Sequence, residues 1–172
     1  VRVLDDLSTG LESNLPTSVD LRIGSVTEQR AIKDSMVGVD GCFHLAAIAS
    51  VNGSSQGWAH AHGVNLTGAV NVFEQASQRL SKPIPVVYAS SAAIYGDNPI
   101  RLLSEYEIPN PLTPYGADKL GCEQHARVAT RLFNVPTFGL RFFNVYGPRQ
   151  DPGSACCGVV SIFAQKLLDG AP

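Results

Sequence analysis

The sequence places a tyrosine and a lysine four residues apart, Tyr115 and Lys119, directly after Pro114. Proline favours the first turn of a helix, and side chains four residues apart on a helix lie on the same face. The Lys119 ammonium would then favour the phenolate form of Tyr115 and lower a tyrosine pKa that is otherwise about 10. A tyrosine adjusted in this way can act as a general base near neutral pH. The pair therefore predicts proton-transfer chemistry.

A tyrosine and a lysine at this spacing also occur together by chance, so the neighbouring segments decide what the pair indicates. Ser90-Ser91 ends an apolar run upstream of the pair, and Leu140-Arg141-Phe142-Phe143-Asn144 follows downstream. Serines at a strand end can simply satisfy backbone groups. In a catalytic role, Ser91 would hydrogen-bond the same substrate oxygen that Tyr115 deprotonates.

Short apolar runs alternate with segments of helical periodicity along the chain. The pattern predicts strands over residues 1–4, 19–23, 41–47, 86–90 and 137–143. It predicts helices from an N-cap at Thr27 to about Met36, over residues 64–80, from Tyr115 to near Asn134, and over residues 159–168. Strands that alternate with helices form an α/β fold with a doubly wound parallel sheet and right-handed crossovers.

Ligands of such a sheet bind beyond the carboxyl ends of its strands. Small or polar residues stand at or just after each predicted strand end, namely Asp5, Gly24-Ser25, Ala46-Ala47, Ser90-Ser91 and Asn144. We therefore expect one binding site along this edge of the sheet, next to Tyr115 and Lys119.

Asp5 ends the first predicted strand, where a carboxylate accepts hydrogen bonds from an adenosine ribose and repels a 2′-phosphate. It favours NAD over NADP, and a purely turn-forming aspartate is the alternative. The pyrophosphate-binding motif G-x-G-x-x-G is absent from the sequence. Because this motif is expected about 20 residues before the acidic residue, it would fall ahead of Val1. The cofactor site of this chain is thus predicted to be incomplete.

The composition is that of a soluble globular protein, with 172 residues, 44% hydrophobic and 16% charged residues and a net charge of −2. This balance predicts neither nucleic-acid nor membrane binding, and no apolar run reaches the ~20 residues of a membrane span. We expect a cytoplasmic protein. Cys42 and Cys122 lie in apolar patterns typical of buried, reduced thiols, and Cys156-Cys157 lack the spacing of a zinc site, so no metal is predicted.

Two polar residues have open interpretations. Asn65 lies in an otherwise apolar helical pattern, where it faces solvent or hydrogen-bonds the backbone near Tyr115 to hold the site together. Arg149 follows a turn after the last predicted strand, where it binds a phosphate or faces solvent.

These segments resemble the NAD-dependent epimerase/dehydratase family of extended short-chain dehydrogenases/reductases, and within it the 4-epimerases of UDP-glucose and UDP-N-acetylglucosamine. The matching segments span nearly the whole chain, in the order and approximate spacing of the family. They are Leu4-Asp5-Asp6-Leu7-Ser8-Thr9-Gly10, Phe43-His44-Leu45-Ala46-Ala47, Asn65-Leu66-Thr67-Gly68, Ser90-Ser91-Ala92-Ala93-Ile94-Tyr95-Gly96, Tyr115-Gly116-Ala117-Asp118-Lys119 and Leu140-Arg141-Phe142-Phe143-Asn144-Val145-Tyr146-Gly147-Pro148-Arg149.

The resemblance implies a role for each matching position. Tyr115 would be the catalytic base, Lys119 would bind the nicotinamide ribose, and Ser91 would hold the sugar hydroxyl. The cofactor-binding set would be Asp5, Asp6, Ser8, Thr9, Gly10, Ser25, Val26, Leu45, Ala46, Ala47, Ala49, Ser90, Tyr115, Lys119 and Phe142. The substrate-binding set would be Ser50, Ser91, Ala92, Tyr115 and Asn144. The family usually carries an aspartate at the position of Ser25, so adenine contacts here are expected to be weaker or different.

The resemblance also implies a Rossmann-like fold and an isomerase of nucleotide-sugar metabolism and polysaccharide biosynthesis. Residues 1–150 would form a partial NAD-binding domain without its first strand and glycine-rich turn, and residues 151–172 would begin a substrate-binding region. The chain by itself would be inactive. The family usually forms homodimers through two helices, here those over residues 64–80 and 115–134.

The implied reaction is transient oxidation of the sugar at C4, followed by return of hydride to the other face of the 4-keto sugar. Dehydratases of the family carry an acidic pair where this chain has Ala92 and Ala93, which favours epimerisation. The alternatives are a nucleotide-sugar dehydratase or decarboxylase of the same family, and a catalytically silent NAD-binding module.

Overall fold

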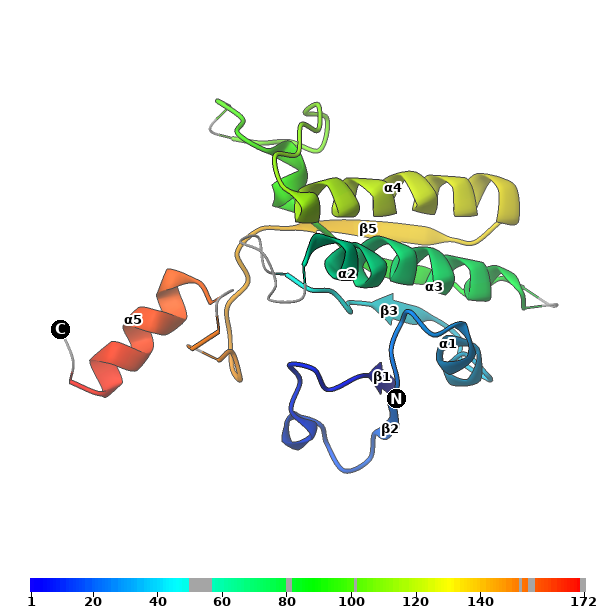
Figure 1. The fold of residues 1–172 in the computed structure, drawn as a ribbon, viewed down its shortest axis with the longest axis horizontal. Helices are drawn as coiled ribbons and strands as arrows, with labels where there is room; N and C mark the ends of the chain where they lie inside the picture. Colours follow the sequence, from blue (N-terminus) through cyan, green and yellow to red (C-terminus); the bar gives the residue numbers. More distant parts are fainter. Residues whose placement is uncertain (50–56, 80–81, 101, 152, 155–156, 171–172) are drawn as a thin grey trace.

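Parallel strands linked by helices make up the computed structural model of the chain, which describes residues 1–49, 57–79, 82–100, 102–151, 153–154 and 157–170 (Figure 1). The strands are β1 (Arg2–Asp5), β2 (Asp20–Ile23), β3 (Cys42–His44), β4 (Val86–Ser91) and β5 (Thr137–Phe142). The helices are α1 (Gln29–Ser35), α2 (Trp58–His62), α3 (Gly68–Ser77), α4 (Pro114–Phe133) and α5 (Val159–Leu168). Short helical turns are η1 (Glu12–Asn14), the π-helical η2 (Gly63–Thr67) and η3 (Ala92–Tyr95). The predicted α/β class is confirmed.

The described strands form two separate parallel sheets. β1 pairs with β2, and β3, β4 and β5 form the second sheet in that order. In the second sheet Ser90 stands opposite Arg141 and Tyr88 opposite Gly139. Because facing residues of neighbouring strands point to the same side, the side chains of Ser90 and Arg141 share one face of this sheet.

Helices α2, α3 and α4 lie on one face of the β3–β4–β5 sheet (Figure 1). On that face Val86 and Tyr88 are 1% and 6% exposed, whereas Phe43 and Phe138 on the opposite face are 76% and 64% exposed. The described residues thus cover one of the two sheet faces.

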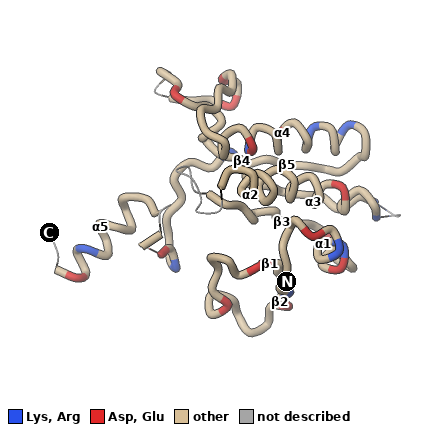
Figure 2. Tube along the Cα trace, viewed as in Figure 1, with Lys and Arg blue, Asp and Glu red and all other residues tan. Residues whose placement is uncertain are grey.

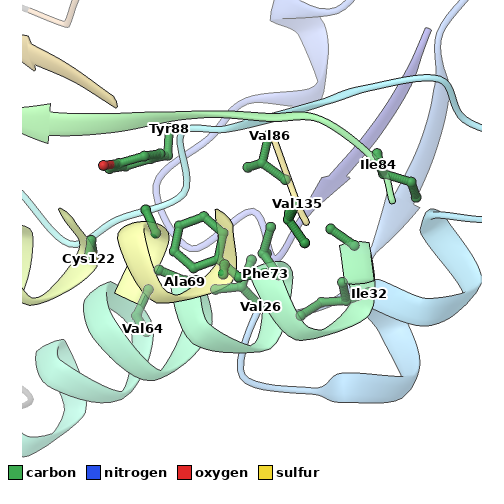
Figure 3. Packing of buried hydrophobic residues seen from close by; sticks show 14 residues of the cluster. Val26, Ile32, Val64, Ala69, Phe73, Ile84, Val86, Tyr88, Cys122 and Val135 are labelled. Atoms are coloured by element: carbon green, nitrogen blue, oxygen red, sulfur yellow. The ribbon is translucent and has the colours of Figure 1, made fainter. Parts of the chain in front are cut away.

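The hydrophobic core lies between α3, α4 and this covered face (Figure 3). The rings of Phe73 on α3 and Tyr88 on β4 meet edge to face, with centroids 5.5 Å apart. Val26, which follows β2, packs against α3 at Gly68, where a Cβ would come within 2.6 Å of Val26 Cγ2. Asn71 Nδ2 donates to the Val26 carbonyl at 3.1 Å. This contact joins the β1–β2 sheet to the helices of the other sheet.

The predicted start of the helix over residues 64–80 was wrong. Helical structure begins at Trp58 with α2, passes through the π-helical turn η2 and continues as α3. The N-cap predicted at Thr27 was also wrong, because α1 begins after Glu28, which makes no side-chain capping bond. Thr27 instead shares a hydrogen bond with Ser25, their side-chain oxygens being 2.9 Å apart.

Residues of both charges are spread along the described trace (Figure 2). Within the described part of the chain, no helix is both long and apolar enough to cross a membrane. Cys42 and Cys122 carry free thiols. Burial raises the pKa of each to about 11, so both thiols are protonated and unreactive at neutral pH.

Candidate active site

The Tyr115–Lys119 pair lies in the first turns of α4. The helix begins at Pro114 because Thr113 caps it, with Thr113 Oγ1 accepting from Gly116 N at 3.0 Å. Lys119 Nζ lies 5.7 Å from the centroid of the Tyr115 ring, so the predicted proximity of the two side chains is confirmed. The ammonium is close enough to act on the tyrosine electrostatically.

Lys119 is 3% exposed, and its Nζ donates to the Ala89 carbonyl of β4 at 2.9 Å. Burial lowers the pKa of Lys119, while the nearby Cys122 and Asp118 act in the opposite direction. This bond to β4 fixes the ammonium at the carboxyl end of that strand, beside Tyr115.

Ser91 is the last residue of β4, and its Oγ accepts from Ala93 N at 3.1 Å, which starts the turn η3. The beginning of α4 packs on this turn, because a Cβ at Gly116 would lie 2.6 Å from the Ala93 carbonyl oxygen. The segments that carry Ser91 and Tyr115 are therefore in direct contact. Gly96 closes the turn with φ of 61°, where a Cβ would overlap the Asn110 carbonyl.

The ends of β1 and β2 meet, with Gly24 N donating to the Asp5 carbonyl at 3.1 Å. Asp5 Oδ1 accepts from Leu7 N at 2.7 Å. Gly10 lies next to the same oxygen, because a Cβ added at Gly10 would be 3.2 Å from it. The loop after β1 thus wraps around the Asp5 carboxylate. The neighbouring Asp6 accepts from Ser8 N at 3.0 Å, and its hydrogen bonds with Ser8 lower the pKa of Asp6.

The segment after β3 is held by Asn65 of η2. Its Oδ1 accepts from Ile48 N at 2.7 Å and its Nδ2 donates to Ile48 O at 3.1 Å. Asn65 is 1% exposed, so the solvent-facing interpretation was wrong, and its amide bonds the backbone of the segment after β3. This segment carries the predicted residues Leu45, Ala46, Ala47 and Ala49; Ser50 lies outside the described residues.

Other predicted residues have partners that bear on their proposed roles. The side chain of Val26 is in the core, and its carbonyl accepts from Asn71 Nδ2. Ser90 is 2% exposed and donates its hydroxyl to Glu123. Phe142 and Asn144 are exposed at and after the end of β5. Arg149 Nη1 donates to the Asn14 carbonyl at 2.8 Å, a contact that neither interpretation of Arg149 included.

The sequence interpretation missed an ion pair and a histidine–aspartate contact around the site. Arg141 on β5 pairs with Glu123 on α4, and His62 on α2 lies 2.7 Å from Asp118 on α4. Asp118 is 4% exposed, and its Oδ2 has no hydrogen-bond partner within the described part of the chain. The available signal was the position of Glu123, one helical turn after Lys119 and on the same face of α4.

The sequence pattern of the NAD dependent epimerase/dehydratase family matches residues 1–172. A curated putative UDP-glucose 4-epimerase of Methanocaldococcus jannaschii is 33% identical, over 98% of this chain and 55% of that protein. The crystal structure of the UDP-glucose 4-epimerase of Thermotoga maritima with UDP-glucose has a TM-score of 0.89 and 33% identity, over 99% of this chain and 55% of that one. The Thermus thermophilus UDP-glucose 4-epimerase complex with NAD has a TM-score of 0.86 and 34% identity, over 99% and 55%.

The chain therefore belongs to the NAD-dependent epimerase/dehydratase family, and its fold is the Rossmann-like fold of these structures. It spans about half the length of the relatives it matches.

The residues present suit the cofactor of the family, which is NAD. The Asp5 carboxylate at the end of β1 can accept hydrogen bonds from ribose hydroxyls. The small side chains after β3 leave the backbone accessible to the cofactor. The Lys119 ammonium supplies a donor at the end of β4. NAD, when bound, provides the group that accepts and returns hydride.

Proposed function

We propose that the complete protein is a nucleotide-sugar 4-epimerase that acts on a UDP-hexose or a UDP-N-acetylhexosamine. The observation that carries the proposal is the Tyr115–Lys119 pair, 5.7 Å apart from ammonium to ring centroid, beside the end of β4 in a chain of this family. Such a pair provides one tuned base, which is what oxidation of an alcohol requires of the protein.

Each side chain has a defined task in this proposal. Tyr115 takes the proton of the sugar 4-hydroxyl, and Lys119 favours its phenolate form and binds the nicotinamide ribose. Ser91 hydrogen-bonds the same sugar oxygen, and Asn144 binds the phosphates of the nucleotide sugar. Asp5 and the loop after it bind the adenosine ribose. The remaining members of the cofactor and substrate sets line the space between these groups.

Epimerisation is preferred to dehydration because of the residues that follow Ser91. Elimination of water needs an acid and a base near C5 and C6 of the sugar, and the turn η3 begins instead with Ala92 and Ala93. Neither methyl group can move a proton, so these two positions supply no acid or base for elimination.

We further propose that residues 1–150 form most of an NAD-binding domain and that residues 151–172 begin the substrate-binding region. β1 and β3 each have one edge without a strand partner among the described residues. One additional parallel strand between them, leading into a glycine-rich turn, would join the two sheets and complete the pyrophosphate site.

The protein is proposed to act as a cytoplasmic homodimer, in nucleotide-sugar metabolism that serves polysaccharide synthesis. α4 has an outer apolar surface at Val128, Leu132 and Phe133, which are 44%, 71% and 55% exposed. A second copy would cover this surface, and a monomer at micromolar concentration in sedimentation analysis would contradict the dimer.

The proposed activity is tested with the complete open reading frame, purified and offered UDP-glucose and UDP-N-acetylglucosamine separately. Chromatography of the products should show the 4-epimer of one of them. A 4-keto-6-deoxy or decarboxylated sugar would instead indicate a dehydratase or decarboxylase. If both sugars return unchanged, other nucleotide sugars are tried, and failure with all of them would indicate a silent NAD-binding module.

A further inference from the structure

Glu123 on α4 and Arg141 on β5 form a two-bond ion pair close to the candidate active site. Arg141 donates from Nε to Glu123 Oε1 at 2.9 Å and from Nη2 to Glu123 Oε2 at 2.8 Å. The two parallel bonds match the planar guanidinium to the carboxylate and fix their relative orientation. The Arg141 side chain is 20% exposed and the Glu123 side chain 16%, so solvent screens the pair only weakly.

The pair attaches α4 to β4 at a defined place. Glu123 follows Lys119 by one helical turn, so Tyr115, Lys119 and Glu123 share one face of the helix. Glu123 Oε1 accepts from Ser90 Oγ at 2.6 Å, and Lys119 Nζ donates to the carbonyl of the preceding residue, Ala89. Consecutive turns of α4 are thus bonded to consecutive residues of β4, which fixes both the rotation and the translation of the helix.

Arg141 also holds the two segments that flank the start of α4. Its Nη1 donates to the Tyr95 hydroxyl at 2.8 Å and to the Glu105 carbonyl at 3.0 Å. Tyr95 ends η3, the turn that begins directly after Ser91, and its ring centroid lies 5.1 Å from the guanidinium carbon. Glu105 belongs to the segment that leads to the Thr113 cap. One guanidinium therefore links β5, α4, η3 and this segment.

Both members of the pair are charged at neutral pH. Burial by itself raises the pKa of Glu123, but the hydrogen bonds from Arg141 and Ser90 outweigh it and hold that pKa below its usual value. The hydrogen bonds to Glu123 raise the pKa of Arg141. Shielded ion pairs often add little net stability, because the loss of hydration offsets the attraction, and they can instead specify one arrangement of the chain.

We propose that Glu123 and Arg141 are a positioning pair that sets where Tyr115 stands relative to Ser91. This inference rests on the proposed function. The pair acts through α4 and η3 and takes no part in proton transfer itself. A displacement of about 1 Å between a base and its substrate oxygen costs up to roughly 10²-fold in rate.

The test uses Glu123→Gln, Arg141→Gln and the double variant in the complete open reading frame. Each single change should lower kcat at least ~10-fold while KM changes less than ~3-fold, since ground-state binding does not depend on the base. The double variant should be no slower than the slower single variant, because both changes break one unit. Asp20→Asn is the matched control. Asp20 lies in β2, and its carboxylate accepts from Arg2 Nε at 2.8 Å. This change also breaks an arginine–carboxylate pair and should leave kcat unchanged.

A second measurement is independent of activity. Hydrogen exchange of the amides in residues 115–119 and 92–96 should become faster in Glu123→Gln and stay unchanged in Asp20→Asn. If the wild type makes no epimer, the proposed function fails while the exchange result still decides the positioning role. Three results would overturn the inference. The first is unchanged exchange in Glu123→Gln. The others are a multiplicative loss of kcat in the double variant and an equal loss of kcat in Asp20→Asn. If Glu123→Gln does not fold, Tyr95→Phe, which removes one hydroxyl from the same junction, replaces it in both measurements.

Discussion

Tyr115 is the residue on which the proposed chemistry depends. Replacing Tyr115 by phenylalanine keeps the ring and removes the oxygen that takes the proton. We expect turnover to fall at least ~10²-fold, the usual contribution of a general base, while bound NAD is retained. Steady-state rates and the NAD content of the purified variant check both parts. Turnover close to that of the wild type would remove Tyr115 from the base role.

His44 at the end of β3 makes stability depend on pH. Burial lowers the pKa of His44 from 6.5 to about 4, and the charge of Lys119 acts in the same direction. Between these two values the unfolded chain binds more protons than the folded chain, so folding stability falls as the pH is lowered. From about pH 7 to about pH 5 the loss from this group is roughly 2 kcal/mol.

Urea denaturation of the wild type and of His44→Gln at both pH values measures this loss. The variant should lose less stability than the wild type on acidification, because the glutamine does not titrate. Equal losses in the two proteins would show that His44 is not buried in its neutral form.

At the scale of elements, α4 is the part that positions most of the site, and its start depends on one cap. Thr113→Ala removes the oxygen that accepts from Gly116 N and should destabilise the protein by about 1 kcal/mol. Thr113→Ser keeps that oxygen and should remain close to the wild type. Thermal or urea denaturation of the two variants decides, and equal stability of the two would contradict the capping role.

Elements with local signals were predictable from the sequence. α5 has the predicted bounds of residues 159–168, and α4 ends at Phe133, where Asn134 adopts a left-handed conformation with φ of 55°. α2 was missed because Trp-Ala-His-Ala-His has no apolar periodicity, and the π-helical turn that follows has no simple sequence signal.

The parts of the site that depend on distant residues were less predictable. The proximity of Tyr115 and Lys119 follows from helix geometry alone, and it was confirmed. The bonds between Glu123 and Arg141, and between Asn65 and Ile48, join segments whose proximity depends on strand order and helix packing. Periodicity within one segment carries no information on such contacts.

At the scale of the whole molecule, the two sheets and the missing glycine-rich motif make a prediction about cofactor binding. A hydrogen bond to a charged phosphate is worth roughly 1.5–3 kcal/mol, and a pyrophosphate turn provides such bonds. We therefore expect the 172-residue chain to bind NAD at least ~10-fold more weakly than the complete open reading frame. Calorimetric titration of both proteins measures the ratio. Equal affinities would show that the pyrophosphate site lies within this chain.

Oxidation and reduction of the sugar at C4 can be tested by running the reaction in D₂O. The complete protein is given its UDP-sugar in D₂O, and the 4-epimer is isolated and analysed by mass spectrometry and NMR. We expect an epimer without deuterium on carbon, because the hydrogen removed from C4 returns to C4 without exchange with solvent. Deuterium bound to a sugar carbon would show instead that the configuration changes by proton transfer at carbon, without hydride transfer at C4.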